Sequence, residues 1–348
     1  MSDSIDVQDK EEAIDSRGHL EKLATQLASL IIQEDGRPNT NAINELTRNI
    51  QYACINTKQF GYYIAKQLKD KHFTNLVEHP SIVNLCCKPS TQKDLESDWV
   101  AYWCQMLKIA RVYHRKIWEL CYIPQALYEH GMLMQGMKGI GFGCGEEPLP
   151  SLFASMGIDI TVTDLDPALS TSGWLDTGQH TTSIDKVWRS ELASKEEFDK
   201  HVTLKYVDMN SIPTDLSGKH DFCWSICAFE HLGTIKAGLD FVENSLRVLK
   251  PGGVSVHTTE YNYNDKETID NWPTVLFQRK HFEELSARLV AQGHEVMPLD
   301  FDLGNDVLDL FVDVPPFGYR NTPQEPHIKL AVDGFPCTCF GVVVRKKA

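Results

Sequence analysis

The chain has 348 residues, of which 42% are hydrophobic and 24% charged, and its formal net charge is -14. This composition is typical of a soluble globular protein, and the length allows one large domain or two of ordinary size. The negative charge disfavours a nucleic-acid partner, whose phosphates it would repel, and no apolar run of about 18 residues suggests a membrane span.

The amino-terminal segment is acidic and polar, without the apolar core of a signal peptide, so disorder is expected over residues 1–18. Ten cysteines occur, yet no pair has the C-x-x-C spacing of a zinc or redox site. Several cysteines stand in apolar runs, where a thiol behaves as a small hydrophobic side chain. Reduced, structural cysteines in a cytoplasmic protein are therefore expected.

Residues 19–130 have the apolar spacing of helices, with a second helical block over 43–68 and a third over 99–128. Pro124 is expected to kink or break the third block. This block is rich in aromatic residues, which favours the core of a helical subdomain. The alternative is a lid over the substrate, in which residues 113–116 offer polar groups to it.

Between residues 131 and 348, strand-like and helix-like runs alternate, which predicts a doubly wound α/β domain. The expected strands are 132–138, 158–163, 202–207, 222–227, 254–259, 295–300 and 340–345. The expected helices are 149–156, 235–249 and 281–291, and long connections are expected over 170–200, 261–280 and 301–336. In such a sheet, ligands bind at the carboxyl ends of the strands.

A glycine-rich turn over residues 139–148 follows the first expected strand, and the second strand ends in Asp164. This order is typical of a unit that binds a nucleoside cofactor. A dinucleotide turn has a third glycine where this chain has Glu146, whose carboxylate would face a pyrophosphate at the helix N-terminus. S-adenosylmethionine has no phosphate and carries a cationic ammonium and sulfonium. The turn therefore favours S-adenosylmethionine over NAD.

Residues 132–348 resemble the class I (Rossmann-like) S-adenosylmethionine-dependent methyltransferases. The motifs that carry the resemblance are the glycine turn, Asp164, and the segments 207–209, 229–232, 245–253 and 339–346. The resemblance implies a seven-stranded, mostly parallel sheet with an antiparallel last strand. More loosely, the segments 147–150, 173–174, 179–180 and 257–260 are similar to uncharacterised methyltransferases of bacterial glycan and secondary-metabolite clusters.

By resemblance, Gly141 and Gly143 approach the methionine part of the cofactor, Asp164 binds the ribose, and Asp208 with Met209 holds the adenine. A simple turn role for Asp208 stays open. The residues expected to contact the cofactor are Gly141, Phe142, Gly143, Glu146, Asp164, Leu165, Asp208, Met209 and Cys227. Members of this family usually have an acid two residues before the first motif glycine, where this chain has Gly139. We expect Glu146 or Glu147 to replace it.

Four candidate catalytic side chains follow the fourth and fifth strands: Glu230, His231, His257 and Glu260. A histidine suits a general base because its pKa lies near neutrality. A helix cap at 230–231 and a core histidine at 257 stay open as structural alternatives. These four side chains also have the character of a divalent-metal site, but Cys227 stands where a related pattern has a carboxylate. No metal is therefore expected.

The expected function is O-methylation of a small-molecule or glycan hydroxyl with a histidine base. The alternatives are a nitrogen or sulfur acceptor served mainly by positioning, and a non-catalytic S-adenosylmethionine-binding protein. An NAD-dependent oxidoreductase is disfavoured by Glu146. Trp174 and His180 are further candidates for ligand contacts in the loop after the second strand. Homo-oligomerisation is allowed, and neither a nucleic-acid nor a membrane partner is expected.

Overall fold

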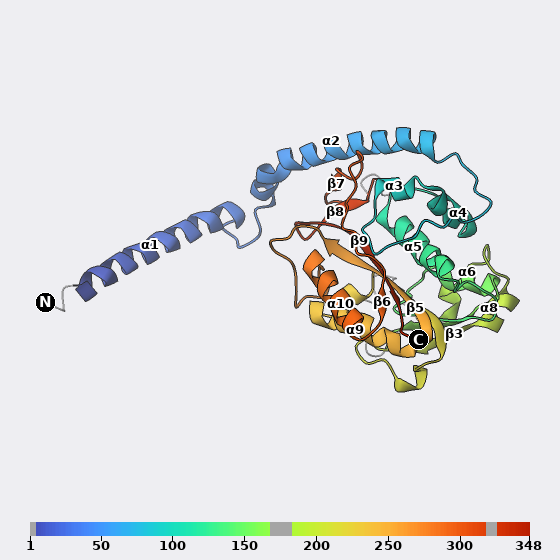
Figure 1. The fold of residues 1–348 in the computed structure, drawn as a ribbon. Helices are drawn as coiled ribbons and strands as arrows, with labels where there is room; N and C mark the ends of the chain where they lie inside the picture. The colour runs from blue at the N-terminus through green and yellow to red at the C-terminus, as the bar shows by residue number, and fades with distance from the viewer. Residues whose placement is uncertain (1–4, 168–182, 318–325) are drawn as a thin grey trace. The chain divides into compact units, whose positions relative to one another are not determined.

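The structure of the chain is a computed structural model, and it describes residues 5–167, 183–317 and 326–348 (Figure 1). Trp174 and His180 lie outside these residues. The chain divides into two units, Met1–Phe60 and Gly61–Ala348. The sequence placed the boundary near residue 130, whereas the structure places it within α2 (Thr40–His72). Helix α1 (Ile5–Ile31) begins well before residue 19, the start of the predicted helical region.

The larger unit is built on a nine-stranded sheet with the order β3-β2-β1-β4-β5-β9-β8-β7, and β6 also pairs with β9. Strands β1 to β5 pair in parallel, and β9 is antiparallel to β5, as the resemblance implies. The strands are β1 (Lys138–Gly141), β2 (Asp159–Asp164), β3 (Val202–Tyr206), β4 (His220–Ile226), β5 (Leu249–Asn262), β6 (Glu295–Val296), β7 (Val312–Asp313), β8 (Lys329–Val332) and β9 (Phe335–Arg345).

The prediction of seven strands is corrected to nine, because β7 and β8 form where a long connection was expected. Strand β8 pairs antiparallel with β9 through a turn at Asp333 and Gly334, whose φ angles are 48° and 85°. An Asp-Gly pair between apolar runs is a strong hairpin signal, since both central residues of this turn need positive φ. Strand β7 has only two residues, which is too short for an alternation of apolar and polar residues to predict it.

Strand β1 begins where the predicted strand ends, at Lys138. A Cβ on Gly139 would lie 2.4 Å from the Phe222 ring, and one on Gly141 would lie 2.5 Å from the Trp224 ring. The aromatic side chains of β4 therefore fill the space beside β1, and only glycine fits there. This packing also explains why no acid stands at position 139.

The α-helices of the larger unit beyond α2 are α3 (Gln92–Leu95), α4 (Asp98–Met106), α5 (Arg115–Glu129), α6 (Leu149–Ser155), α8 (Lys195–His201), α9 (Ile235–Ser245) and α10 (Arg279–Ala291). Short 3₁₀ turns are η1 (Ile184–Val187), η2 (Thr214–Leu216), η3 (Phe229–His231) and η4 (Leu246–Val248). The expected break at Pro124 is wrong: Pro124 lies inside α5, and the third helical block is interrupted between α4 and α5 instead.

Helices α5 and α9 cover opposite faces of β5, because successive side chains of a strand point to opposite sides. The His257 ring lies edge-on to Phe241 of α9, with centroids 5.3 Å apart. The next residue, Thr258, donates a hydrogen bond of 2.6 Å to Glu119 of α5. Figure 1 shows α9 and α10 on one side of β5 and β9, with α5 on the other. No described helix is long and apolar enough to cross a membrane.

Candidate functional site

A pocket of about 410 Å³ opens at the carboxyl ends of β1, β2, β3 and β4. Seven of the nine residues expected to contact a cofactor line it: Gly143, Glu146, Asp164, Leu165, Asp208, Met209 and Cys227. Lys116, Glu147, His231 and Leu232 are also part of its wall. The topology of the sheet gathers these residues, since they follow four strands that lie side by side in the order β3-β2-β1-β4.

Gly141 and Phe142 do not line this pocket, and their contact with a cofactor stays a prediction. Gly141 is covered by the Trp224 ring, as described above. The Phe142 side chain is fully buried and packs edge-on against Phe241 of α9, with centroids 5.3 Å apart. Alternation along the chain directs this side chain into the core, a feature that the motif alone does not reveal.

The glycine turn needs its glycine at position 143, where φ is +60°. A Cβ there would lie 2.9 Å from the Ala228 Cβ and 3.3 Å from the Met209 Sδ. Both neighbours line the pocket. A side chain at this position would therefore strain the backbone and narrow the pocket.

Asp164 ties the glycine turn to the end of β2. One carboxylate oxygen accepts a hydrogen bond of 3.2 Å from the Gly145 amide, and the other accepts one of 2.8 Å from the Leu165 amide. An ionised carboxylate has about four lone-pair positions, so these bonds leave acceptor capacity towards the pocket. Asp164 thus has a structural role in the turn in addition to any contact with a ribose.

Asp208 likewise has a local role. Its Oδ1 accepts a hydrogen bond of 2.8 Å from the Asn210 amide, which closes a turn after β3. The side chain is exposed and lies on the wall of the pocket. The turn role and the predicted contact with adenine are compatible, because the second carboxylate oxygen is not needed for the turn.

The two glutamates of the turn differ in their surroundings. Glu146 is exposed and pairs with Lys186 at 3.2 Å. Glu147 is partly buried, and its Oε1 accepts a hydrogen bond of 2.6 Å from the Trp224 indole. Burial raises the pKa of Glu147 to about 8, because the indole hydrogen bond only partly offsets the loss of solvent. A cationic ligand in the pocket would favour the ionised form of this side chain.

His257 does not reach the pocket, and its predicted role as a base is corrected. The side chain is fully buried. Its Nδ1 lies 2.8 Å from Ser225 Oγ, and its Nε2 lies 2.6 Å from Ser255 Oγ. Burial lowers the pKa of His257 to about 3, so the ring is neutral. The structural alternative left open by the sequence, a core histidine with its hydrogen bonds satisfied, describes this residue.

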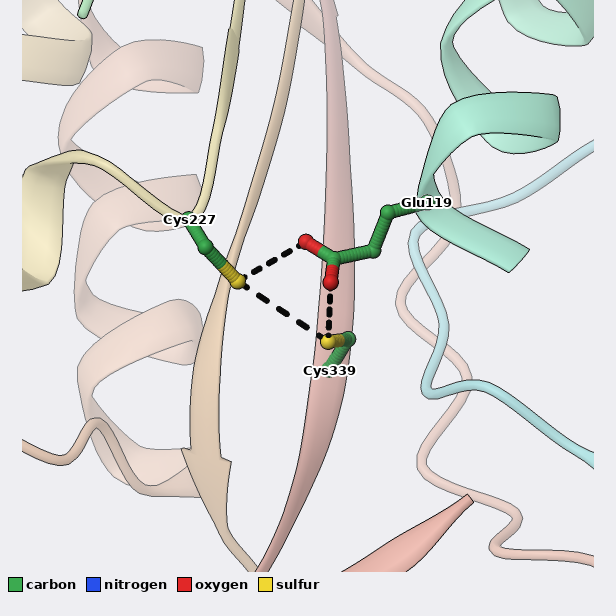
Figure 2. A group of neighbouring side chains, drawn as sticks. All are labelled: Glu119, Cys227 and Cys339. Carbon is green, nitrogen blue, oxygen red and sulfur yellow. Dashed lines mark hydrogen bonds between the residues drawn. The ribbon is translucent and has the colours of Figure 1, made fainter. Parts of the chain in front are cut away.

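Behind the pocket wall lies a cluster of charged and thiol side chains, here called the Arg115 cluster: Arg115, Glu119, Cys227, Glu260 and Cys339. Arg115 Nη1 lies 2.6 Å from Glu260 Oε1. The Glu119 carboxylate accepts hydrogen bonds from both thiols, at 2.8 Å from Cys227 and 2.7 Å from Cys339 (Figure 2). Figure 2 shows these three side chains converging from α5, the end of β4 and β9.

The Arg115 cluster has the residue types of a metal site, and the ligand atoms of Glu119, Cys227 and Cys339 lie within 4.8 Å of one another. However, Arg115 Nη1 lies 3.2 Å from the Cys339 sulfur and 3.6 Å from the Cys227 sulfur. The chain thus supplies its own cation at this position, and a metal would have to displace it. Burial also raises the pKa of both thiols, which disfavours the thiolates that a soft metal needs.

Glu260, which belongs to the Arg115 cluster, and Glu230 are both buried, and neither lines the pocket. Glu230 accepts a hydrogen bond of 3.0 Å from Thr259. Burial raises the pKa of Glu260, although the Arg115 charge opposes this effect. Their predicted role as catalytic acids or bases is therefore corrected to the support of neighbouring side chains.

His231 is the one predicted catalytic residue that lines the pocket. Its Nδ1 lies 3.1 Å from the Pro273 carbonyl oxygen, which can only accept a hydrogen bond. The proton of a neutral ring therefore sits on Nδ1, and Nε2 carries the lone pair. Glu230 Oε1 lies 4.0 Å from Nε2. This arrangement suits a general base.

The sequence missed Glu119 and Cys339 as parts of this site. Glu119 follows Arg115 by four residues on α5, a spacing that brings two side chains together on a helix surface. From that spacing, the proximity of Glu119 to Arg115 could have been predicted. Cys339 had none, since its place beside Glu119 depends on how β9 pairs with β5.

No protein-family model and no curated protein matches the sequence. Among solved structures, a proposed sarcosine dimethylglycine methyltransferase from Galdieria sulphuraria is similar, with 16% identity, a TM-score of 0.44, and coverage of 72% of this chain and 99% of that one. A SAM-dependent methyltransferase from Aquifex aeolicus has 16% identity and a TM-score of 0.36, and covers 64% of this chain and 88% of its own. The [4+2]-cyclase SpnF has 19% identity and a TM-score of 0.37, covering 52% and 61%. At these values, the similarities do not by themselves identify an activity.

Proposed function

We propose that the chain is an S-adenosylmethionine-dependent methyltransferase that binds its co-substrate in the pocket of the glycine turn. The observation that carries this proposal is the pair Glu146 and Glu147 at the place where a dinucleotide would put its pyrophosphate. Glu147 lines the pocket at a partly buried position, where burial raises its pKa to about 8; a cationic group in the pocket favours the ionised form of this side chain, and a phosphate does not. Asp164 then accepts hydrogen bonds from the ribose hydroxyls.

The acceptor is proposed to be a hydroxyl of a small molecule or glycan, deprotonated by His231. The acceptor oxygen attacks the methyl carbon, the bond from carbon to sulfur breaks, and sulfur keeps the electron pair to leave neutral S-adenosylhomocysteine. The hydroxyl proton passes to Nε2 of His231. Positioning supplies the larger share of such an acceleration, about 7–11 kcal/mol, and the base adds a factor of about 10² to 10⁴.

Helix α5 brings the helical part of the chain to the pocket through Lys116. Its Nζ lies 3.3 Å from Glu119 Oε1, and the partly exposed side chain forms part of the pocket wall. We propose that this ammonium stabilises the negative charge that develops on the acceptor oxygen. We propose that α5 is the part of the predicted helical cap that contacts the acceptor, because Lys116 of this helix lines the pocket.

The first experiment incubates the full chain with methyl-labelled S-adenosylmethionine and a panel of hydroxyl compounds, and measures S-adenosylhomocysteine. Label transferred to an oxygen supports the proposal. Tight binding without transfer to any panel member would point to the non-catalytic alternative.

The second experiment tests the base, once an acceptor is found. His231→Asn is expected to lower kcat by about 10² to 10⁴. His201→Asn is the control, because His201 pairs with Asp159 at the surface, away from the pocket. An unchanged kcat in His231→Asn would contradict the base and favour a nitrogen or sulfur acceptor.

A further inference from the structure

Helix α1 exposes a row of four leucines to solvent. Leu20, Leu23, Leu27 and Leu30 are 65%, 47%, 62% and 57% exposed. Every described residue of α1 from position 18 to its end is exposed. An isolated helix in water is marginal, because packing of an apolar face supplies most helical stability in proteins. The row therefore needs a partner.

The spacing of the row indicates the kind of partner. The leucines alternate at three and four residues, which is the a and d pattern of a coiled-coil seam and narrower than the stripe of a helix that lies on a globular core. A helix of complementary spacing fits such a seam by placing its side chains between those of α1.

The residues that flank the seam carry no full charge at neutral pH. Positions e and g hold His19, Ala24, Gln26 and Ile31. In a chain with a net charge of -14, this uncharged border lets two copies approach without repulsion along the seam. Coiled coils that select a different partner usually do so with charges at e and g. Their absence favours a second copy of the same chain.

The following helix repeats the pattern within the same unit. Ile50 and Phe60 of α2 are 65% and 71% exposed, and Ala53 and Thr57 between them complete the same spacing. A short connection joins the two helices, in which the Asn39 amide donates a hydrogen bond of 2.5 Å to the Ile31 carbonyl. The seam on α1 spans only two heptads, so the second face on α2 adds contact area.

We propose that the unit Met1–Phe60 is a dimerisation module. The α1 seams of two copies pack against each other through their leucines, and the α2 faces extend the contact into an assembly of four helices. This proposal is independent of the proposed methyl transfer, because every residue of the pocket lies in the unit Gly61–Ala348.

The test measures the mass of the full chain by analytical ultracentrifugation over roughly 1–100 µM, a range in which a dimer responds to mass action. The expected mass is twice the 39.4 kDa of one chain. Leu23→Glu together with Leu27→Glu is expected to give the single-chain mass. The matched control is Thr25→Glu together with Ser29→Glu, which adds the same charge to α1 outside the seam and is expected to stay dimeric.

A single-chain mass for the unmodified protein at all concentrations would overturn the proposal, and so would a dimer that survives the double leucine change. Urea unfolding transitions of both variants, measured in parallel, show whether the larger unit is folded. Loss of the dimer in the seam variant alone, with that unfolding transition retained, supports the module.

Discussion

Glu147 is the side chain on which the nature of the pocket depends most. It is held by the Trp224 indole, and burial raises its pKa to about 8. At neutral pH the empty pocket therefore contains a mostly protonated glutamate. A bound cation favours the ionised form, so ligand binding and loss of this proton are linked.

The first prediction concerns the affinity for S-adenosylhomocysteine as pH changes. Because the ammonium group of the ligand prefers ionised Glu147, the affinity should rise as pH increases towards 8, by up to about tenfold per pH unit below that value. Glu147→Gln should weaken binding by about 10- to 100-fold at pH 8 and flatten this dependence. Calorimetric titrations from pH 6 to 8 measure both effects. Glu146→Gln is the control, and equal losses in both variants would contradict the assignment.

His257 shows how an apparent catalytic residue serves the core. Its ring nitrogens bind the hydroxyls of Ser225 and Ser255, and its ring packs against Phe241. Loss of the imidazole removes a hydrogen-bond partner from both buried hydroxyls, which costs free energy, although Ser255 Oγ keeps a contact of 3.4 Å with Ser245 Oγ. The residue thus supports the layer between β5 and α9.

The second prediction is that His257→Ala lowers the free energy of unfolding by about 2–4 kcal/mol, the cost of unpaired hydroxyls and a cavity. Urea unfolding measures this change. Affinity for S-adenosylhomocysteine should stay within about twofold, since the ring does not touch the pocket. A variant with an unchanged free energy of unfolding that no longer binds S-adenosylhomocysteine would indicate that His257 belongs to the binding site.

At the scale of elements, the glycine turn depends on its backbone shape. The third prediction is that Gly143→Ala loses most affinity for S-adenosylhomocysteine while the protein stays folded, because the new Cβ strains a positive φ and approaches Ala228. Gly252→Ala is a matched control: φ is +76° there, and no atom lies within 4 Å of an added Cβ. It should cost about 1 kcal/mol of stability and leave binding unchanged. Equal affinity in both variants would show that the turn does not hold the ligand.

The attachment of α5 to the sheet depends on the charge of Glu119. Burial alone would raise its pKa, but the charges of Lys116 and Arg115 lower the pKa to about 2, below the ordinary range of a glutamate. A lowered folded pKa stabilises the protein above the unfolded pKa, and this stabilisation is lost as pH falls through the folded value. The contribution is about 3 kcal/mol at neutral pH.

The fourth prediction follows from this sign. Glu119→Gln should lower the free energy of unfolding at pH 7 by about 3 kcal/mol, because the buried Arg115 and the partly exposed Lys116 lose the charge of a neighbouring carboxylate. At pH 2.5 the difference from the unmodified protein should shrink. Urea unfolding midpoints of the variant and the unmodified protein at the two pH values measure the two stability differences. Glu196→Gln on the surface of α8 is the control. An equal difference at both values would contradict the charge assignment.

Helices and strands whose apolar residues recur with a clear period were predictable from the sequence. Elements whose residues depend on packing against neighbouring side chains were not. Strand β2 and helix α10 lie within two residues of their predicted bounds, because alternating or helical apolar spacing marks them. Strand β1 was displaced, since its glycines look like a loop until the rings of Phe222 and Trp224 are placed beside them. The Asp333–Gly334 pair predicts a hairpin turn and therefore a strand such as β8 before it, but a long connection was expected there instead.

At the scale of the whole molecule, the position of the boundary between the two units could not be predicted from the sequence. The helical blocks before residue 130 look alike in apolar spacing, yet α5 packs on β4, β5 and β9 and belongs to the larger unit. Only α1 and the first part of α2 form the smaller unit. Periodicity predicts helices, whereas the partner of each apolar face depends on the sheet. For the same reason, the fold class was predictable and the composition of the Arg115 cluster was not.

The central claim is that the pocket holds a cationic, phosphate-free adenosyl donor. The most direct measurement is a pair of calorimetric titrations of the full chain at pH 8, one with S-adenosylhomocysteine and one with NAD. The account predicts saturable binding of S-adenosylhomocysteine, lost in Gly143→Ala, and no binding of NAD. Saturable binding of NAD with none of S-adenosylhomocysteine would contradict it.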